Sequence, residues 1–307
     1  MTSPNPADER NASIEYLSAD AHHVSAHVLR AHNPAAPVFL CLPAMGVAAA
    51  YYTGFGEALR NSGVHVVISD LRGIGSSSMR ASRACDFGYR EILVHDLPAL
   101  VAAVRERFPA SPRFLFGHSL GGQLWSLYLA ANPGAADGIV NLATCNVHYT
   151  GWPRPARYGV LATALWFRFL GETLGYVPAG RFGFAGDEAK TLIEDWSNNC
   201  LKGTYVLAND ALDYEGALRS LQKPVLSLSL EGDRLAPRQA TDSLVAKMES
   251  ANVTRRHLSL AELGLARGSH FSWCKRPAAV VGAIREWING AVKAGGAMQP
   301  GHRADAL

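Results

Sequence analysis

Hydrophobic residues along this chain occur in short runs that alternate with longer stretches of helical spacing. The runs are bounded by glycine, proline or polar residues, which is typical of buried strands in a parallel sheet. The predicted strands of this set cover residues 38–42, 64–69, 113–116, 138–144, 224–230 and 254–260. The alternation of strand and helix predicts an α/β fold with a mostly parallel central sheet flanked by helices.

The N-terminal part of the chain has a different pattern, because apolar and polar residues alternate one by one. Residues 13–17 and 22–30 are therefore predicted to form a β-hairpin, with His22, His23 and His27 as exposed strand residues and not metal ligands. A long helix is predicted over residues 87–108, kinked or broken at Pro98. The other predicted helices cover residues 51–61, 120–132, 238–251 and 277–292.

The strand pattern is interrupted between residues 146 and 221, where aromatic residues are frequent and no convincing strand is found. A segment of this length is too long for a simple loop, so we predict an inserted helical cap. The predicted organisation is an α/β core of residues 1–145 and 222–294, a cap of residues 146–221, and a disordered tail of residues 295–307.

Composition and charge narrow the functional classes. Of the 307 residues 48% are hydrophobic and 18% charged, and the net charge is only +3, without a dense basic run. We therefore expect a sizeable core and neither nucleic-acid binding nor a membrane span. The polar N-terminus suggests no secretory signal, and five scattered cysteines suggest no disulfide framework or structural zinc. These features favour a cytoplasmic protein, and they do not indicate an oligomeric state.

The chemically most informative motif is Gly117-His118-Ser119-Leu120-Gly121, which fits the G-x-S-x-G nucleophile elbow. A predicted strand precedes it and a predicted helix follows it, as that motif requires. The sharp turn leaves no room for side chains two positions before and after the serine, which explains both glycines. An incidental serine in a glycine-rich turn is the alternative, so the rest of the chain must decide.

A serine hydroxyl needs a base to activate it and an acid to orient that base. Asp233 follows one predicted strand and His270 follows the last one, so the chain has the order Ser, Asp, His. We predict Ser119 as nucleophile, His270 as base and Asp233 as orienting acid, with Glu231 as the rival acid and a helix N-cap as the alternative role of Asp233.

The remaining site residues follow from the same chemistry. The backbone N–H of Leu120 and that of Met45, in the loop after the first parallel strand, are the predicted oxyanion donors, with Ala44 as the fallback for Met45. The elbow and the segment after residue 144 supply the residues predicted to line the substrate pocket: His118, His148, Tyr149 and Trp152. The ring of His118 is expected to point away from the Ser119 hydroxyl, as a packing and hydrogen-bonding neighbour of the oxyanion region. No cofactor or metal is predicted.

Four motifs together resemble the α/β-hydrolase superfamily: the elbow with Gly122, Asp70-Leu71-Arg72-Gly73-Ile74-Gly75-Ser76, Asp233-x-x-x-Pro237, and Gly268-Ser269-His270. The resemblance implies an α/β-hydrolase fold and an acyl-serine intermediate, with Asp70 and Arg72 as structural residues. It also places Pro43-Ala44 where the superfamily usually has His-Gly.

A closer similarity, to a bacterial group of α/β-hydrolases of largely unassigned substrate, rests on five segments: residues 43–47, Tyr51-Tyr52, residues 175–180, Asp195-Trp196, and His270-Phe271 with Trp273.

The sequence therefore predicts a serine hydrolase acting on a carboxylic ester, thioester or amide of a hydrophobic small molecule. Two alternatives remain. The same acyl-enzyme can pass its acyl group to an alcohol, amine or thiol, as in an acyltransferase, or the fold can serve as a non-catalytic ligand-binding protein.

Overall fold

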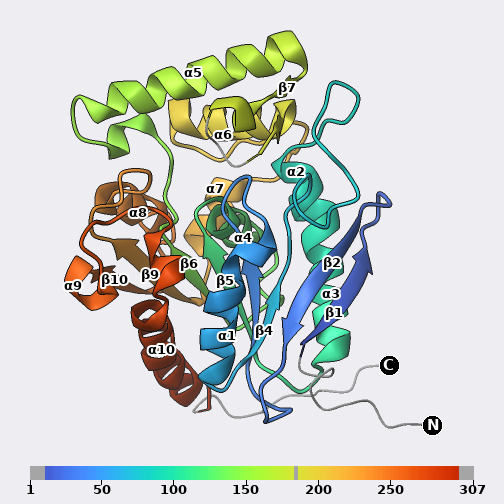
Figure 1. Ribbon diagram of the computed structural model, residues 1–307, viewed down its shortest axis with the longest axis vertical. Helices are drawn as coiled ribbons and strands as arrows, with labels where there is room; N and C mark the ends of the chain where they lie inside the picture. The colour runs from blue at the N-terminus through green and yellow to red at the C-terminus, as the bar shows by residue number, and fades with distance from the viewer. Residues whose placement is uncertain (1–10, 183–185, 297–307) are drawn as a thin grey trace.

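The computed structural model describes residues 11–182 and 186–296 and has a central sheet of eight strands in the order β1-β2-β4-β3-β5-β6-β9-β10 (Figure 1). The strands β3 to β10 of this sheet pair in parallel, whereas β1 and β2 pair antiparallel with each other and β2 pairs antiparallel with β4. The strands are β1 (Asn11–Leu17), β2 (His23–Leu29), β3 (Val38–Leu42), β4 (His65–Ile68), β5 (Arg113–His118), β6 (Gly138–Leu142), β9 (Pro224–Leu230) and β10 (Asn252–Leu258). The predicted fold class is confirmed.

The burial of each strand follows from its place in the sheet. Every residue of β3, β4 and β6 is buried, because helices cover both faces of a parallel sheet. The edge strand β10 is mostly polar and only Leu258 in it is fully buried. The hairpin β1–β2 keeps its predicted alternation, with Val24, Ala26 and Val28 facing inward.

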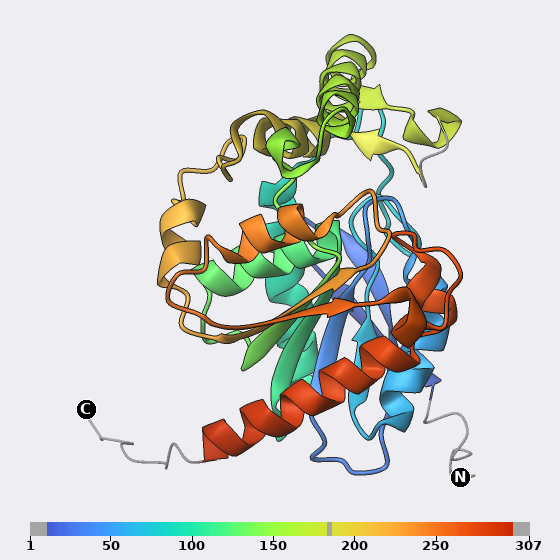
Figure 2. The same cartoon turned by 90° about the vertical axis from the view of Figure 1, so that its left-hand side faces the viewer.

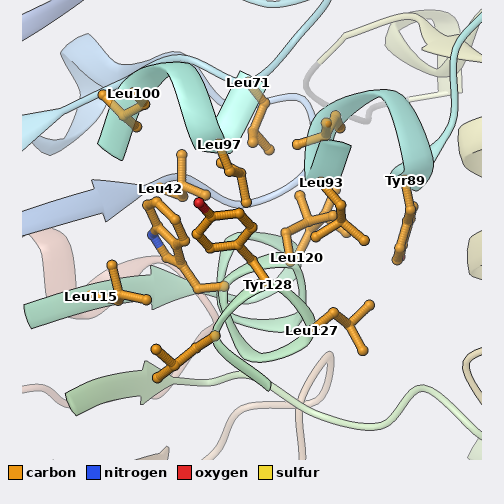
Figure 3. Close-up of a cluster of buried hydrophobic side chains, with 14 of the residues drawn as sticks. Leu42, Leu71, Tyr89, Leu93, Leu97, Leu100, Leu115, Leu120, Leu127 and Tyr128 are labelled. Atoms are coloured by element: carbon orange, nitrogen blue, oxygen red, sulfur yellow. The ribbon is translucent and has the colours of Figure 1, made fainter. Parts of the chain in front are cut away.

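Two layers of helices enclose the sheet. On one face α1 (Thr53–Asn61) packs against α10 (Ala278–Gly296), and Phe55, Leu59, Val280 and Ile284 in this layer are fully buried (Figure 2). On the other face lie α3 (Leu97–Arg107) and α4 (Leu120–Ala131). α4 is buried on all sides from Leu120 to Ala130 and is surrounded by leucines and aromatic rings (Figure 3). Each such buried leucine stabilises the fold by about 1.5–3 kcal/mol.

The chain leaves the sheet after β6 and returns at β9. Between them α5 (Ala156–Leu174) and α6 (Lys190–Lys202) pack together above the sheet, whereas α7 (Tyr214–Ser220) packs against α4 (Figure 2). Two short strands, β7 (Tyr176–Val177) and β8 (Glu188–Ala189), pair antiparallel beside α5. Such two-residue strands have no periodicity, which is why the sequence did not reveal them. Together α5, β7, β8 and α6 form the cap.

The predicted helix over residues 87–108 is divided into three parts. It consists of α2 (Tyr89–Glu91), a π-helical turn (Ile92–Asp96) and α3, with Pro98 in the first turn of α3. A proline cannot donate a hydrogen bond to the preceding turn, and the wider π turn accommodates this loss. The other helical segments are short: α8 (Arg238–Val245), α9 (Leu260–Leu263) and 3₁₀ turns at Ala49–Tyr52, Tyr149–Gly151, Ala179–Phe182 and Ser272–Lys275.

The prediction that His22 is an exposed strand residue was wrong. His22 is fully buried at the turn between β1 and β2, where its ring nitrogens lie 2.9 Å from Asp96 Oδ1 and 2.8 Å from Ser77 Oγ. The guanidinium of Arg72 donates to the carboxylates of both Asp96 and Asp20. This buried polar cluster joins the hairpin to the helix before α3. His23 and His27 are exposed, as predicted.

Asp70 holds the loop after β4. Its two carboxylate oxygens accept hydrogen bonds from the backbone N–H groups of Ala49 (2.6 Å) and Ser76 (2.8 Å). Asp70 and Arg72 are thus bonded within the scaffold. The predicted tail begins inside α10 at residue 295, and its residues 297–307 lie outside the described part of the chain. Of the helices described, none combines the length and the hydrophobicity that a membrane crossing needs.

Candidate active site

Ser119 lies in a strained turn between the end of β5 and the start of α4. Its backbone angles are φ 55° and ψ −118°, which L-residues rarely adopt. A Cβ on Gly117 would lie 2.3 Å from the backbone of Gly122, and one on Gly121 would lie 2.5 Å from the carbonyl oxygen of Leu42. The crowding expected for a nucleophile elbow is therefore present, and glycine is required at both positions.

Asp233 and His270 meet at the carboxyl ends of the strands. Both side chains are buried, and His270 Nδ1 lies 2.8 Å from Asp233 Oδ2. The other carboxylate oxygen of Asp233 accepts hydrogen bonds from the N–H groups of Leu235 (2.8 Å) and Ala236 (3.0 Å). A carboxylate can only accept, so Nδ1 of His270 carries the proton and Nε2 is left as the basic nitrogen. Glu231, the rival acid, instead accepts from the N–H of Leu260 and is exposed.

Two glycines bring the loops of Asp233 and His270 together. Gly232 has φ 77°, and a Cβ on Gly268 would lie 1.9 Å from the carbonyl oxygen of Glu231. The two loops are thus in direct backbone contact just before the acid and the histidine. This contact explains why glycine precedes each of these residues in the sequence motifs.

The N–H groups available to an oxyanion can be identified from the hydrogen bonds around the elbow. The N–H of Ala44, the fallback donor, is already engaged, because it donates to the hydroxyl of Tyr52 at 3.0 Å. The N–H groups of Met45 and Leu120 have no partner within the described residues. Leu120 is the first residue of α4, where backbone N–H groups have no intrahelical acceptor and the helix dipole favours negative charge.

His118 belongs to a buried hydrogen-bonded chain behind the site, as expected of a packing and hydrogen-bonding neighbour of the oxyanion loop, but its predicted place among the pocket-lining residues was wrong. It is fully buried, with Nδ1 2.8 Å from the hydroxyl of Tyr52 and Nε2 3.1 Å from the carbonyl oxygen of His270. Because Ala44 donates to Tyr52, the tyrosine hydroxyl donates to Nδ1, and Nε2–H donates to the carbonyl. Burial, together with the neighbouring His270, holds the pKa of His118 well below its usual value, so its ring is neutral.

A cavity of about 560 Å³ opens in front of Ser119, between the sheet and the cap. Trp152 lines it as predicted, and its indole N–H donates to the carbonyl oxygen of Arg234 at 2.8 Å. His148 and Tyr149 were predicted to line the pocket, but neither is among the lining residues. The ring of His148 instead packs against Gly203 and bonds to the hydroxyl of Thr150.

Most of the residues that line this cavity were not found from the sequence. One face of α5 contributes Ala156, Gly159, Val160, Thr163 and Phe167, and α6 contributes Trp196. The core contributes Ala44, Met45, Leu120, Gln123, Cys145, Val147, Arg234, Leu235 and Phe271 besides Ser119 and His270. The helix α5 has apolar residues on its outer face too, where Tyr158, Leu165, Trp166 and Phe169 are exposed. The pattern alone therefore could not separate pocket from surface.

Cys145 is the other nucleophilic group among the lining residues. Burial raises the pKa of its thiol above the usual value, so the neutral form dominates near neutral pH. Ser119, which lines the same cavity as a histidine oriented by a carboxylate, is the better-placed nucleophile.

The sheet order, the strained serine turn and the Asp233–His270 pair together give the chain an α/β-hydrolase fold. A sequence profile of the family described as serine aminopeptidase, S33 matches residues 32–166, which supports a hydrolase. No curated protein matches the sequence.

Solved structures share the fold at low sequence identity. The chain is similar to Est1E from Butyrivibrio proteoclasticus with bound ferulic acid (15% identity, 91% of this chain and 99% of that chain, TM-score 0.62). It is also similar to the thioesterase domain from the curacin biosynthetic pathway (19% identity, 90% of this chain and 100% of that chain, TM-score 0.57). A third similar structure is the monoacylglycerol lipase of Paleococcus ferrophilus (16% identity, 87% of this chain and 99% of that chain, TM-score 0.59). At these identities the likeness concerns the fold alone.

Proposed function

We propose that the protein is a serine hydrolase that cleaves a carboxylic ester, or a related thioester or amide, of a hydrophobic small molecule through an acyl-serine intermediate. The observation that carries this proposal is the joint opening of Ser119 and His270 onto one apolar cavity, with His270 held by the buried carboxylate of Asp233. A strained serine turn is costly to maintain, and nucleophilic catalysis is a use for it.

In the proposed mechanism, Ser119 Oγ attacks the substrate carbonyl while His270 Nε2 accepts the hydroxyl proton. Asp233 keeps His270 in the required tautomer and stabilises the imidazolium that forms. The N–H groups of Met45 and Leu120 stabilise the oxyanion, and removal of one such donor typically costs about 3–4 kcal/mol. His270 then gives its proton to the leaving group, and a water activated by His270 releases the acid and restores Ser119.

The apolar walls support a hydrophobic substrate. Trp152, Val160, Phe167 and Trp196 surround the space in front of the serine. Burial of apolar substrate surface against them contributes binding free energy of about 25 cal/mol per Å² of area removed from water, before the costs of association.

A fluorophosphonate probe tests the nucleophile directly. We expect the wild-type protein to be labelled, whereas Ser119→Ala should show no labelling and His270→Ala should label at least about 10³-fold more slowly. Glu231→Gln, which alters the exposed carboxylate of the same loop, is the matched control and should label like the wild type. An unlabelled wild-type protein would rule out the proposal, and labelling of Ser119→Ala would move the nucleophile elsewhere.

The bond cleaved is tested with 4-nitrophenyl esters of increasing chain length. A hydrophobic pocket predicts that kcat/KM rises with acyl length until the cavity is filled. Activity on these esters that is independent of chain length would contradict the proposed substrate class. Product analysis with an added alcohol separates hydrolysis from acyl transfer.

A further inference from the structure

One polar side chain interrupts the apolar wall of the cavity near the nucleophile. Gln123 lines the cavity and is only 2% exposed. It lies one turn after Ser119 on α4, with its N–H bonded to the carbonyl oxygen of Ser119 at 3.2 Å. Ser119 is the N-cap of α4 and Gln123 lies in its first turn, and both residues line the cavity.

The hydrogen bonds of Gln123 are incomplete. Its side-chain oxygen accepts from the hydroxyl of Tyr89 at 3.3 Å. Tyr89 is fully buried, which raises the pKa of its hydroxyl well above the usual value and keeps it a donor. The amide nitrogen Nε2 has no hydrogen-bond partner within the described residues and keeps some accessible surface. Because Gln123 lines the cavity, the two N–H donors of this carboxamide are available to a ligand there.

The neighbouring polar side chains do not share this property. The hydroxyl of Thr163, on the cap side of the cavity, donates to the carbonyl oxygen of Gly159 at 2.9 Å. Arg234 is exposed at the loop of Asp233. Among the described residues that line the cavity, other than Ser119 and His270, Gln123 is therefore the buried polar side chain with an unused hydrogen-bond donor.

We propose that the Gln123 amide donates a hydrogen bond to an oxygen on the acyl chain of the substrate. This inference rests on the proposed function and names its substrate class: esters whose acyl chain carries a keto, ether or hydroxyl oxygen several atoms from the scissile carbonyl. One helical turn advances about 5.4 Å, which corresponds to an oxygen on the fourth or fifth carbon. The acyl chain is the relevant arm because it stays bound to Ser119 on α4, whereas the leaving group must lie against His270, which protonates it.

The test compares two esters with the same leaving group, 4-nitrophenyl 5-oxohexanoate and 4-nitrophenyl hexanoate, with rates divided by those of alkaline hydrolysis. For the wild type we expect kcat/KM to be about 10-fold higher for the oxo ester, the effect of one neutral hydrogen bond. In Gln123→Met, which has a similar volume but no donor, the ratio should fall to about one. Thr163→Val is the matched control and should keep the wild-type ratio.

Fluorophosphonate labelling separates the possible failures. If the wild type is labelled at Ser119 but hydrolyses both esters equally well, or if Gln123→Met keeps the wild-type ratio, the role of Gln123 is refuted and the hydrolase proposal stands. If the wild type is neither labelled nor active, the proposed function itself fails and the inference falls with it. Gln123→Met should be labelled normally whether or not Gln123 binds the acyl chain. Loss of labelling in this variant would contradict a role limited to the acyl chain.

Discussion

The two sides of the cavity are constructed differently. On the core side, Ser119, Asp233 and His270 are positioned by backbone features. Ser119 has a positive φ, the neighbouring glycines are packed so closely that a Cβ would clash, and backbone N–H groups bind the carboxylate of Asp233. On the cap side, the walls consist of side chains on one face of α5 and of Trp196 on α6. These side chains are held by packing between helices and not by backbone hydrogen bonds to the site.

This difference predicts different consequences of mutation. Changes on the core side should alter the reaction of every substrate, because the reacting atoms depend on that geometry. Changes on the cap side should alter which substrates are accepted while leaving the chemistry intact. Four experiments test this division, from the largest expected effect to the smallest.

The substitution Gly121→Ala should disrupt the backbone turn that positions Ser119 on the core side of the cavity. The new Cβ would lie 2.5 Å from the backbone carbonyl oxygen of Leu42, and backbone cannot move away as a flexible side chain could. We expect the free energy of unfolding in urea to fall by at least about 3 kcal/mol, with loss of fluorophosphonate labelling. Gly134→Ala, where a Cβ meets nothing within 4 Å, is the control and should change stability by less than about 0.5 kcal/mol. A Gly121→Ala protein of normal stability would show that the elbow tolerates a side chain.

Glu188 should make the stability of the cap depend on pH. It is buried in β8, and burial, with Asp187 nearby, raises the pKa of its carboxyl to about 8. The folded chain then keeps a proton that the unfolded chain releases above its usual pKa of 4.5. Stability is therefore lost as the pH rises from about 5 to 8, by at most about 1.4 kcal/mol per pH unit.

Glu188→Gln removes this titration. Its urea unfolding should become less dependent on pH between pH 5 and 8, so that its stability relative to wild type rises by at most about 3–4 kcal/mol over that range. Glu172→Gln changes an exposed acid of the cap and should keep the wild-type slope. Equal slopes for Glu188→Gln and wild type would mean that Glu188 is ionised in the folded protein. Labelling of Ser119 should be unaffected, because Glu188 does not line the cavity.

Tyr52→Phe tests the hydrogen-bonded chain behind the core side. It removes the acceptor of the Ala44 N–H and the donor to His118, whose Nε2–H bonds to the His270 carbonyl. We expect fluorophosphonate labelling and ester hydrolysis to slow by about 10-fold, with chain-length preference unchanged.

The matched control for Tyr52→Phe is Tyr51→Phe. The hydroxyl of Tyr51 donates to the Phe271 carbonyl oxygen at 3.4 Å, and this side chain is exposed. Its loss should change the rates less than about 2-fold. A Tyr52→Phe protein that slows only with long esters would place Tyr52 in substrate binding, contrary to the division proposed above.

Val160→Phe should affect the cap side alone. The larger ring would occupy part of the cavity opposite Ser119, so kcat/KM should fall several-fold for long acyl chains and little for acetyl esters, with normal labelling by a small fluorophosphonate. Leu165→Phe, on the exposed face of the same helix, should leave the chain-length profile unchanged. A uniform loss over all chain lengths would show that α5 also supports the catalytic geometry.

The core was accessible from the sequence because local patterns determine it. Continuous apolar runs marked the inner strands, and the order of Ser119, Asp233 and His270 at strand ends predicted that these residues would lie together. The structure brings Asp233 and His270 into contact and opens Ser119 and His270 onto one cavity, while their catalytic roles stay a prediction. Met45 as oxyanion donor also stays a prediction, supported by the engagement of the Ala44 N–H.

The failures concern residues whose environment depends on distant parts of the chain. His22 is buried because Asp96, 74 positions away, faces it, and alternation along a strand contains no such information. His148 and Tyr149 follow β6 as expected of pocket residues, but the chain turns there toward Gly203. Gln123 had a detectable signal, since it is a polar residue in the first turn of a mostly apolar helix that starts directly after the predicted nucleophile.

Helix α5 has one face on the cavity and one exposed face, which bears on protein engineering and on the divergence of related proteins. It begins after Pro155, ends at Leu174 before Gly175 with φ 82°, and supplies one wall of the cavity but none of the three predicted catalytic residues. A segment with such clear ends can be exchanged between related enzymes as a cassette of residues 156–174. We expect such chimaeras to inherit the chain-length profile of the cassette donor and the turnover chemistry of the host.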